Sequence, residues 1–123
     1  MNAPPRILIV EDDSSSRQTL QNIFELEGFD VVTASNGREA LESLAQARPA
    51  VIVLDLMMPV MNGWELMQRL NSDDHYANIP VVVASGATEE GEAASAVAFF
   101  PKPINLGALV EEVRSLCRKE AVA

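Results

Sequence analysis

Acidic side chains in this sequence directly follow short apolar runs. The run at 50–54, Ala-Val-Ile-Val-Leu, leads into Asp55, and the run at 7–10 leads into Glu11, Asp12 and Asp13. Unbroken apolar runs are typical of parallel strands covered on both faces, and open α/β sheets place their ligands at the carboxyl ends of such strands. A carboxylate at that place must be solvated, paired or bound to metal. Asp55 is therefore the candidate reactive residue.

Three carboxylates, those of Glu11, Asp12 and Asp55, are expected to meet at one edge of the sheet. Their mutual repulsion predicts that at least one takes up a proton when no cation is present. A hard divalent cation such as Mg²⁺ resolves the conflict, and the backbone carbonyl of Met57 is a further candidate ligand. An aspartate beside Mg²⁺ is suited to attack a phosphoryl donor and to form an aspartyl-phosphate.

Two more polar residues end apolar runs of the same kind. Ser85 ends the run at 79–85, and Lys102 lies just past the short run at 98–100. The hydroxyl and the ammonium group would each donate to an oxygen of a phosphoryl group on Asp55. Taken singly, an acidic loop, a turn serine and a surface lysine are ordinary features. Their placement at matching strand ends supports the hypothesis of one site.

The elements that must position these residues alternate along the chain. Predicted strands lie at 6–10, 30–34, 50–54, 79–85 and 98–100, and predicted helices at 14–27, from 37, from 63, weakly at 89–97, and after Asn105. This alternation predicts an α/β, flavodoxin-like (βα)5 three-layer sandwich whose five parallel strands have the order 2-1-3-4-5. Because 86–97 is short and rich in alanine, the fourth of these helices is expected to be shortened or irregular.

Composition limits the possible classes of protein. The 123 residues, 48% of them hydrophobic, fit one domain at 6–119, with a disordered lead-in at 1–5 and a tail at 120–123. We expect no membrane insertion, because no apolar run is long enough. The lone Cys117 favours a cytoplasmic location, and the net charge of −9 disfavours direct binding of nucleic acid.

Four motifs resemble a known family over almost the whole chain. They are Ile-Leu-Ile-Val-Glu-Asp-Asp at 7–13, Val-Leu-Asp-Leu-Met-Met-Pro at 53–59 followed by Met-Asn-Gly at 61–63, Pro-Val-Val-Val-Ala-Ser at 80–85, and Lys-Pro at 102–103. Together they are similar to the receiver domain of bacterial two-component response regulators. The resemblance implies a phosphoacceptor switch that assists its own phosphorylation and dephosphorylation and is not an enzyme in the ordinary sense.

The resemblance also implies partners and a metal site. Asp55 would receive its phosphoryl group from a sensor histidine kinase or a histidine phosphotransfer protein, and the phosphorylated domain would act on a downstream effector protein. Mg²⁺ would be the cofactor. Asp12 and Asp55 would bind it directly, Met57 through its carbonyl and Glu11 through water.

Residues that respond to phosphorylation are implied in the same way. Ser85 and Lys102 would contact the phosphoryl group, Phe99 would take the position of the switch aromatic residue, and the bond between Lys102 and Pro103 would be cis. Two departures from the family pattern stand out besides the short segment at 86–97. Glu11 stands where an aspartate is commoner, and Pro101 is compatible with a strand only at the edge of a sheet.

Two alternatives were weighed against this interpretation. A flavodoxin-like cofactor binder is disfavoured, because the acidic loop at 11–13 repels phosphate. A pseudo-receiver, which would act as a protein-interaction module without phosphorylation, stays open because of the short segment at 86–97. The same segment predicts a protein that is monomeric when unphosphorylated. The sequence does not decide between a stand-alone receiver and part of a longer regulator.

Overall fold

The computed structural model describes residues 3–122 except 57, 59–60 and 87–95. Five strands are present in it: β1 (Arg6–Val10), β2 (Asp30–Ala34), β3 (Val51–Leu54), β4 (Val81–Ser85) and β5 (Ala98–Pro101). The described helices are α1 (Ser14–Leu26), α2 (Gly37–Gln46), α3 (Gly63–Asn71) and α4 (Leu106–Val122). All strand pairs are parallel and the order is β2-β1-β3-β4-β5. The predicted fold class and strand order are confirmed.

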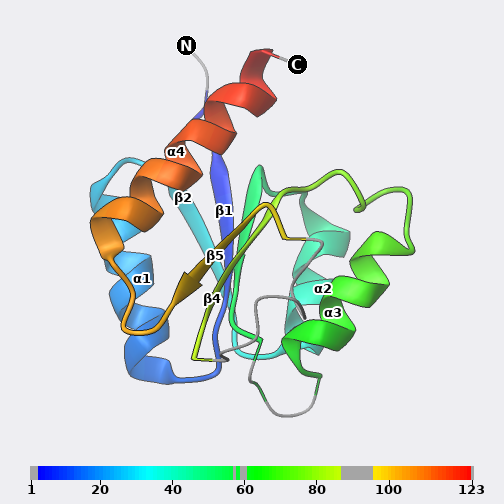
Figure 1. Ribbon diagram of the computed structural model, residues 1–123. Coiled ribbons are helices and arrows are strands. Elements are labelled where there is room, and N and C mark those ends of the chain that lie inside the picture. The colour runs from blue at the N-terminus through cyan, green and yellow to red at the C-terminus, as the bar shows by residue number, and fades with distance from the viewer. Residues whose placement is uncertain (1–2, 57, 59–60, 87–95, 123) are drawn as a thin grey trace.

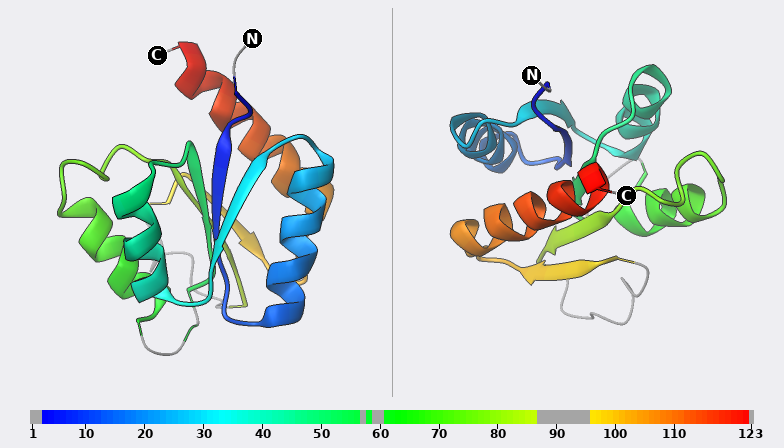
Figure 2. Two further views of the ribbon diagram at one scale, coloured as in Figure 1. Left: turned by 180° about the vertical axis from the view of Figure 1, so that it is seen from behind. Right: turned by 90° about the horizontal axis from the view of Figure 1, so that it is seen from above.

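The sheet is the middle layer of three. Helices α1 and α4 cover one face and α2 and α3 cover the other (Figure 1; the view from above in Figure 2). Alternate residues of each central strand point to opposite faces, so the core divides into two clusters. The cluster under α1 and α4 includes Ile7, Ile9, Val51, Val53, Val82, Phe24 and Leu109, and the cluster under α2 and α3 includes Leu8, Val10, Ile52, Leu54, Val83, Leu44 and Leu66. The unbroken apolar runs follow from burial on both faces.

Each described helix begins at a side chain that caps it. The carboxylate or amide oxygens of Asp13, Asn36, Asn62 and Asn105 accept a hydrogen bond from the backbone N–H three residues later, over 2.8 to 3.0 Å. A cap of this kind stabilises a helix by about 1 kcal/mol. At the other end of α1, Gly28 has a positive φ of 95° and ends the helix. These caps thus define where the described helices begin, and Gly28 defines where α1 ends.

The edge strand β5 and the two residues after it show two features expected from the sequence. Pro101 is the last residue of β5, which is the outermost strand, so the missing N–H leaves the sheet intact. The bond between Lys102 and Pro103 is cis. The helix α4 continues to Val122, past the expected end of the domain at 119. The helix expected at 89–97 lies largely outside the described residues.

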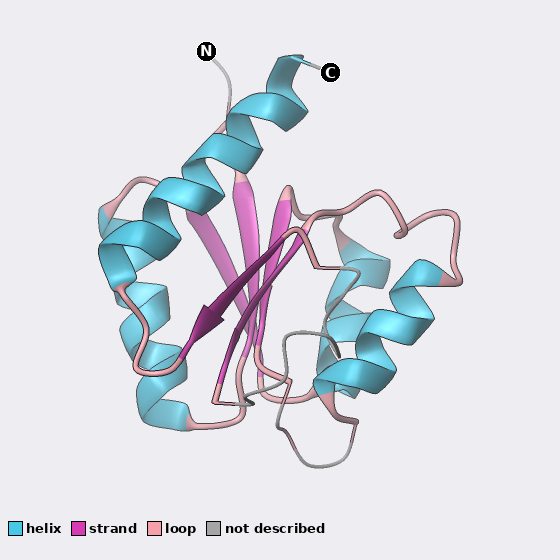
Figure 3. Ribbon diagram, in the orientation of Figure 1, coloured by secondary structure: helices cyan, strands magenta, loops and turns pink. Residues whose placement is uncertain are grey.

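The polarity of the sheet determines where a site can form. All strands run in the same direction, so their carboxyl ends gather at one edge (Figure 3), while the two ends of the chain lie at the opposite edge (Figure 1). Among the helices that the structure describes, none combines the length and the apolar character that a membrane crossing requires.

Candidate functional site

The parallel pairing of the strands brings four polar residues together at the carboxyl ends of the strands. Glu11 follows β1, Asp55 follows β3, Ser85 ends β4 and Lys102 follows β5. The ladder continues past the strand ends, because the N–H of Asp55 donates to the carbonyl of Val10 at 3.0 Å and the N–H of Lys102 donates to the carbonyl of Ser85 at 3.0 Å. The predicted convergence of these residues is therefore built into the parallel register.

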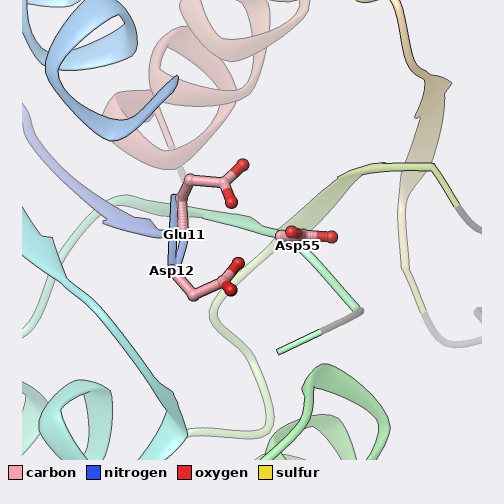
Figure 4. Close-up of side chains that lie close together, drawn as sticks. All are labelled: Glu11, Asp12 and Asp55. Atoms are coloured by element: carbon pink, nitrogen blue, oxygen red, sulfur yellow. The ribbon is translucent and has the colours of Figure 1, made fainter. Parts of the chain in front are cut away.

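The three carboxylates form one cluster. Glu11, Asp12 and Asp55 each offer an oxygen, and these oxygens lie within 4.8 Å of one another. Figure 4 shows the side chains of Glu11 and Asp12 extending from the end of β1 toward Asp55. Glu11 and Asp55 are almost fully buried, with 2% and 5% of their surface exposed, whereas Asp12 is exposed. Of the three carboxylates, that of Asp12 is thus the one exposed to solvent.

Ser85 and Lys102 both contact Asp55. The Ser85 hydroxyl donates a hydrogen bond to Oδ1 of Asp55 at 3.0 Å. The Lys102 ammonium lies 3.5 Å from Oδ2 of the same carboxylate and 2.8 Å from Oε1 of Glu11. A hydroxyl and an ammonium group therefore lie at the two oxygens of Asp55, and the longer Glu11 side chain takes the shorter contact with the lysine.

The buried carboxyl group of Glu11 has a raised pKa. Burial raises the pKa of its carboxyl from 4.5 to about 7. The hydrogen bond from Lys102 opposes the rise, and the negative charge of Asp55 adds to it. The raised pKa makes Glu11 the carboxylate on which the predicted uptake of a proton would fall, and burial contributes more to the shift than the repulsion from which it was predicted.

The pKa of Lys102 is also raised, which in an ammonium group favours the charged form. Burial lowers the pKa of the Lys102 ammonium, but the hydrogen bond to Glu11 and the charges of Asp55 and Glu11 outweigh burial, so the pKa lies above 10.5. The lysine is thus positively charged at neutral pH. This single ammonium group faces the two buried carboxylates of Glu11 and Asp55, so a further cation at the site would be attracted to them.

The donor set fits a hard divalent cation. Its described ligand candidates are carboxylate oxygens, the ligand type that Mg²⁺ prefers, and three of them meet within 4.8 Å. The acidic triad is of the type found at receiver Mg²⁺ sites. The carbonyl of Met57, also predicted as a ligand, lies outside the described residues.

Phe99 lies on β5, in register with Val83 of β4. Its partly buried ring packs against the core on the α2 and α3 side of the sheet. Its role as a switch residue stays a prediction.

Sequence reasoning missed one residue that contacts the acidic segment. The guanidinium group of Arg17 donates from Nη1 to the backbone carbonyl of Glu11 at 2.9 Å and to that of Asp12 at 3.2 Å. A signal was present, because Arg17 follows the capping Asp13 by four residues, about one helical turn. This spacing allows a long side chain to reach back toward the end of β1.

Comparison with known proteins supports the same interpretation. The model of the response regulator receiver domain matches residues 7–114. The response regulator MprA of Mycolicibacterium vanbaalenii is 38% identical over 119 residues, which cover 94% of this chain and 52% of that protein. The transcriptional regulatory protein PrrA of Mycobacterium tuberculosis is 37% identical over 118 residues, which cover 94% of this chain and 51% of that protein. The chain thus spans about half the length of these curated relatives.

Solved structures agree over nearly the full length of both chains. A response regulator receiver protein from Pseudomonas putida superposes with a TM-score of 0.86 at 30% identity, covering 94% of this chain and 99% of that one. A Vibrio cholerae chemotaxis protein, CheY4, gives a TM-score of 0.84 at 32% identity, covering 93% and 99%. With these matches over 94% of its length, the chain belongs to the response regulator receiver domain family, the phosphoacceptor modules of two-component signalling.

Proposed function

We propose that Asp55 is the phosphoacceptor of this receiver domain. The observation that carries the proposal is the environment of its carboxylate, which combines a hydroxyl donor, an ammonium group and two further carboxylates. Ser85 donates to one oxygen at 3.0 Å and Lys102 lies 3.5 Å from the other. Because Ser85 and Lys102 contact this carboxylate, both are close enough to donate to a phosphoryl group attached to it.

The reaction is a transfer from phosphohistidine to carboxylate. An oxygen of Asp55 attacks the phosphorus, the P–N bond breaks, and its electron pair stays on the imidazole nitrogen, which takes up a proton. The product is an acyl phosphate on Asp55. Lys102 then donates to one new phosphoryl oxygen and Ser85 to another, so both side chains exchange a carboxylate partner for a phosphoryl partner.

The residues that would hold Mg²⁺ are those of the acidic cluster. Asp12 and Asp55 would bind it directly, Met57 through its carbonyl and Glu11 through water. When bound, Mg²⁺ neutralises the charge that develops on the transferred phosphoryl group. The exposed position of Asp12 supports this assignment, because a cation and its remaining waters need access from solvent.

The proposal extends to partners and location. Receiver domains work with histidine kinases, and we expect the donor to be a sensor histidine kinase or a histidine phosphotransfer protein, with a downstream effector protein as the recipient of the signal. Since such phosphoryl groups derive from ATP, we expect the reaction in the cytoplasm. Phe99 is proposed as the aromatic residue that moves when Ser85 turns to the phosphoryl group. We further propose a single domain at 6–119 that is monomeric when unphosphorylated.

Mg²⁺-dependent labelling by acetyl phosphate tests the function. Wild-type protein should gain one phosphoryl group only when Mg²⁺ is present, and Asp55→Asn should gain none, because an amide is a poor nucleophile. Asp74→Asn is the matched control, since Asp74 is exposed and lies on the segment that leads to the opposite end of the sheet. Labelling of Asp55→Asn at the wild-type rate would overturn the assignment. Wild-type protein that is never labelled would favour a phosphorylation-independent interaction module.

A further inference from the structure

The side chain of Arg17 is engaged with backbone atoms of the acidic segment. Its Nη1 donates to two consecutive carbonyls, that of Glu11 at 2.9 Å and that of Asp12 at 3.2 Å. Arg17 is half-buried on α1, whose N-terminal cap, Asp13, is the next residue of the same segment. One guanidinium group therefore ties the start of the helix to the two residues that carry carboxylates into the site.

These two carboxylates need different orientations. Glu11 is turned inward and meets Lys102 at 2.8 Å. Among the described residues, none donates a hydrogen bond to the carboxylate of Asp12 or forms an ion pair with it, so the course of the backbone is what brings this side chain near Asp55. Rotation of the peptide between Glu11 and Asp12 would carry the Asp12 carboxylate away from Asp55. The two carbonyl contacts of Arg17 restrain that rotation.

Charge alone predicts the opposite effect of this residue. A guanidinium group beside a cation site repels the cation, so its removal should strengthen cation binding. Orientation of the ligands predicts that its removal weakens binding, because a partner outside the ligand shell typically changes metal affinity by about 10- to 100-fold. The sign of the change distinguishes the two effects.

We propose that Arg17 is a positioning residue that orients the Glu11–Asp12 backbone for binding of a divalent cation. This inference rests on the proposed function, since it assigns a role toward the cation of that site. Arg17 acts through the carbonyls it holds and does not contact the cation. Both carbonyls accept from one guanidinium nitrogen, Nη1, which the long arginine side chain carries back to the segment, whereas the shorter lysine side chain offers a mobile point charge.

Calorimetric titration of the full chain with Mg²⁺ tests the proposal without relying on phosphorylation. Arg17→Met should raise the Kd for Mg²⁺ about tenfold, and Arg17→Lys, which keeps the charge and can reach one carbonyl, should raise it by less. The labelling rate by acetyl phosphate at saturating Mg²⁺ should stay near that of wild type in both variants. The defect should thus appear in the Mg²⁺ dependence of the rate and not in its maximum.

Arg114→Met is the matched control. Arg114 is also a helical arginine with contacts of its own, an ion pair to Glu27 at 2.6 Å and a position 5.3 Å from the ring centre of Phe29. Its loss should lower the melting temperature and leave the Kd for Mg²⁺ unchanged. If Arg17→Met does not fold, Arg17→Lys alone carries the test.

Each outcome has one meaning. An unchanged Kd in both Arg17 variants would overturn the inference, and so would tighter binding in Arg17→Met, which would show an effect of charge only. Weaker binding in Arg17→Met with an intermediate value for Arg17→Lys would support it. Wild-type protein that binds no Mg²⁺ would instead refute the proposed metal site itself.

Discussion

The buried Glu11 carboxyl should make the metal-free protein lose stability as the pH rises. Its pKa is about 7 in the folded protein against an ordinary value of 4.5. Between these values the folded state binds more protons than the unfolded state, so the free energy of unfolding falls as the pH increases. The stabilisation is complete below pH 4.5 and is lost as the pH rises through about 7.

The size of the effect follows from the same shift. One pKa unit corresponds to about 1.4 kcal/mol, so the full difference between 4.5 and about 7 corresponds to about 3.5 kcal/mol, most of which is lost between pH 4.5 and pH 8. Glu11→Gln removes the titrating proton and keeps an oxygen that can accept the hydrogen bond from Lys102. Relative to wild type, this variant should therefore gain up to about 3 kcal/mol between pH 4.5 and pH 8.

Urea unfolding in the presence of a chelator, measured at several pH values from 4.5 to 8, provides the assay. The difference between the Glu11→Gln and wild-type curves cancels the titration of groups that both share. Glu42→Gln removes one negative charge from an exposed helical position and controls for the change in net charge. Parallel pH profiles for Glu11→Gln and wild type would refute the reasoning, because they would show that Glu11 titrates alike in both states.

Mg²⁺ should reverse this pH dependence. Protons and the cation compete for the same carboxylates, so the stabilisation that Mg²⁺ gives should grow as the pH rises and vanish in acid. Thermal melts across pH with and without Mg²⁺ measure this increment. An increment that is the same from acid to neutral pH would contradict competition at the acidic cluster.

Two further predictions concern the loops around the site. Gly63→Ala should destabilise the protein by about 1 to 3 kcal/mol in urea unfolding, because a Cβ there would lie 2.5 Å from the Cα of Leu56, whereas Gly107→Ala, with 3.6 Å to its nearest neighbour, should not. The aspartyl-phosphate should be persistent, since Met57 and Ala87, two residues after the phosphoacceptor and the site serine, cannot orient a water molecule. Met57→Asn with Ala87→Glu should speed the loss of phosphate, as followed by release of inorganic phosphate, although both residues lie outside the described part of the chain.

Local sequence was sufficient to locate the site. Apolar runs long enough for one strand, separated by polar segments that hold capping residues such as Asp13, Asn36 and Asn105, predicted the order of strands and helices, because strand burial and helix capping depend on residues close in sequence. The parallel arrangement then required the residues after β1, β3, β4 and β5 to meet. Pro101 could be assigned to an edge strand for an equally local reason, the absence of an N–H.

What depended on tertiary structure was the division of roles inside the site. The sequence places Glu11 and Asp12 side by side, and only packing against α1 and the loop after β5 turns Glu11 inward to Lys102 and leaves Asp12 exposed. The contact of Arg17 with two backbone carbonyls and the close approach of Gly63 to the end of β3 also join atoms of separate segments. Burial, side-chain reach and pKa depend on what lies across the fold. Residue types and spacing therefore identified which groups meet, and the packed structure decided which of them is buried, paired or open to a ligand.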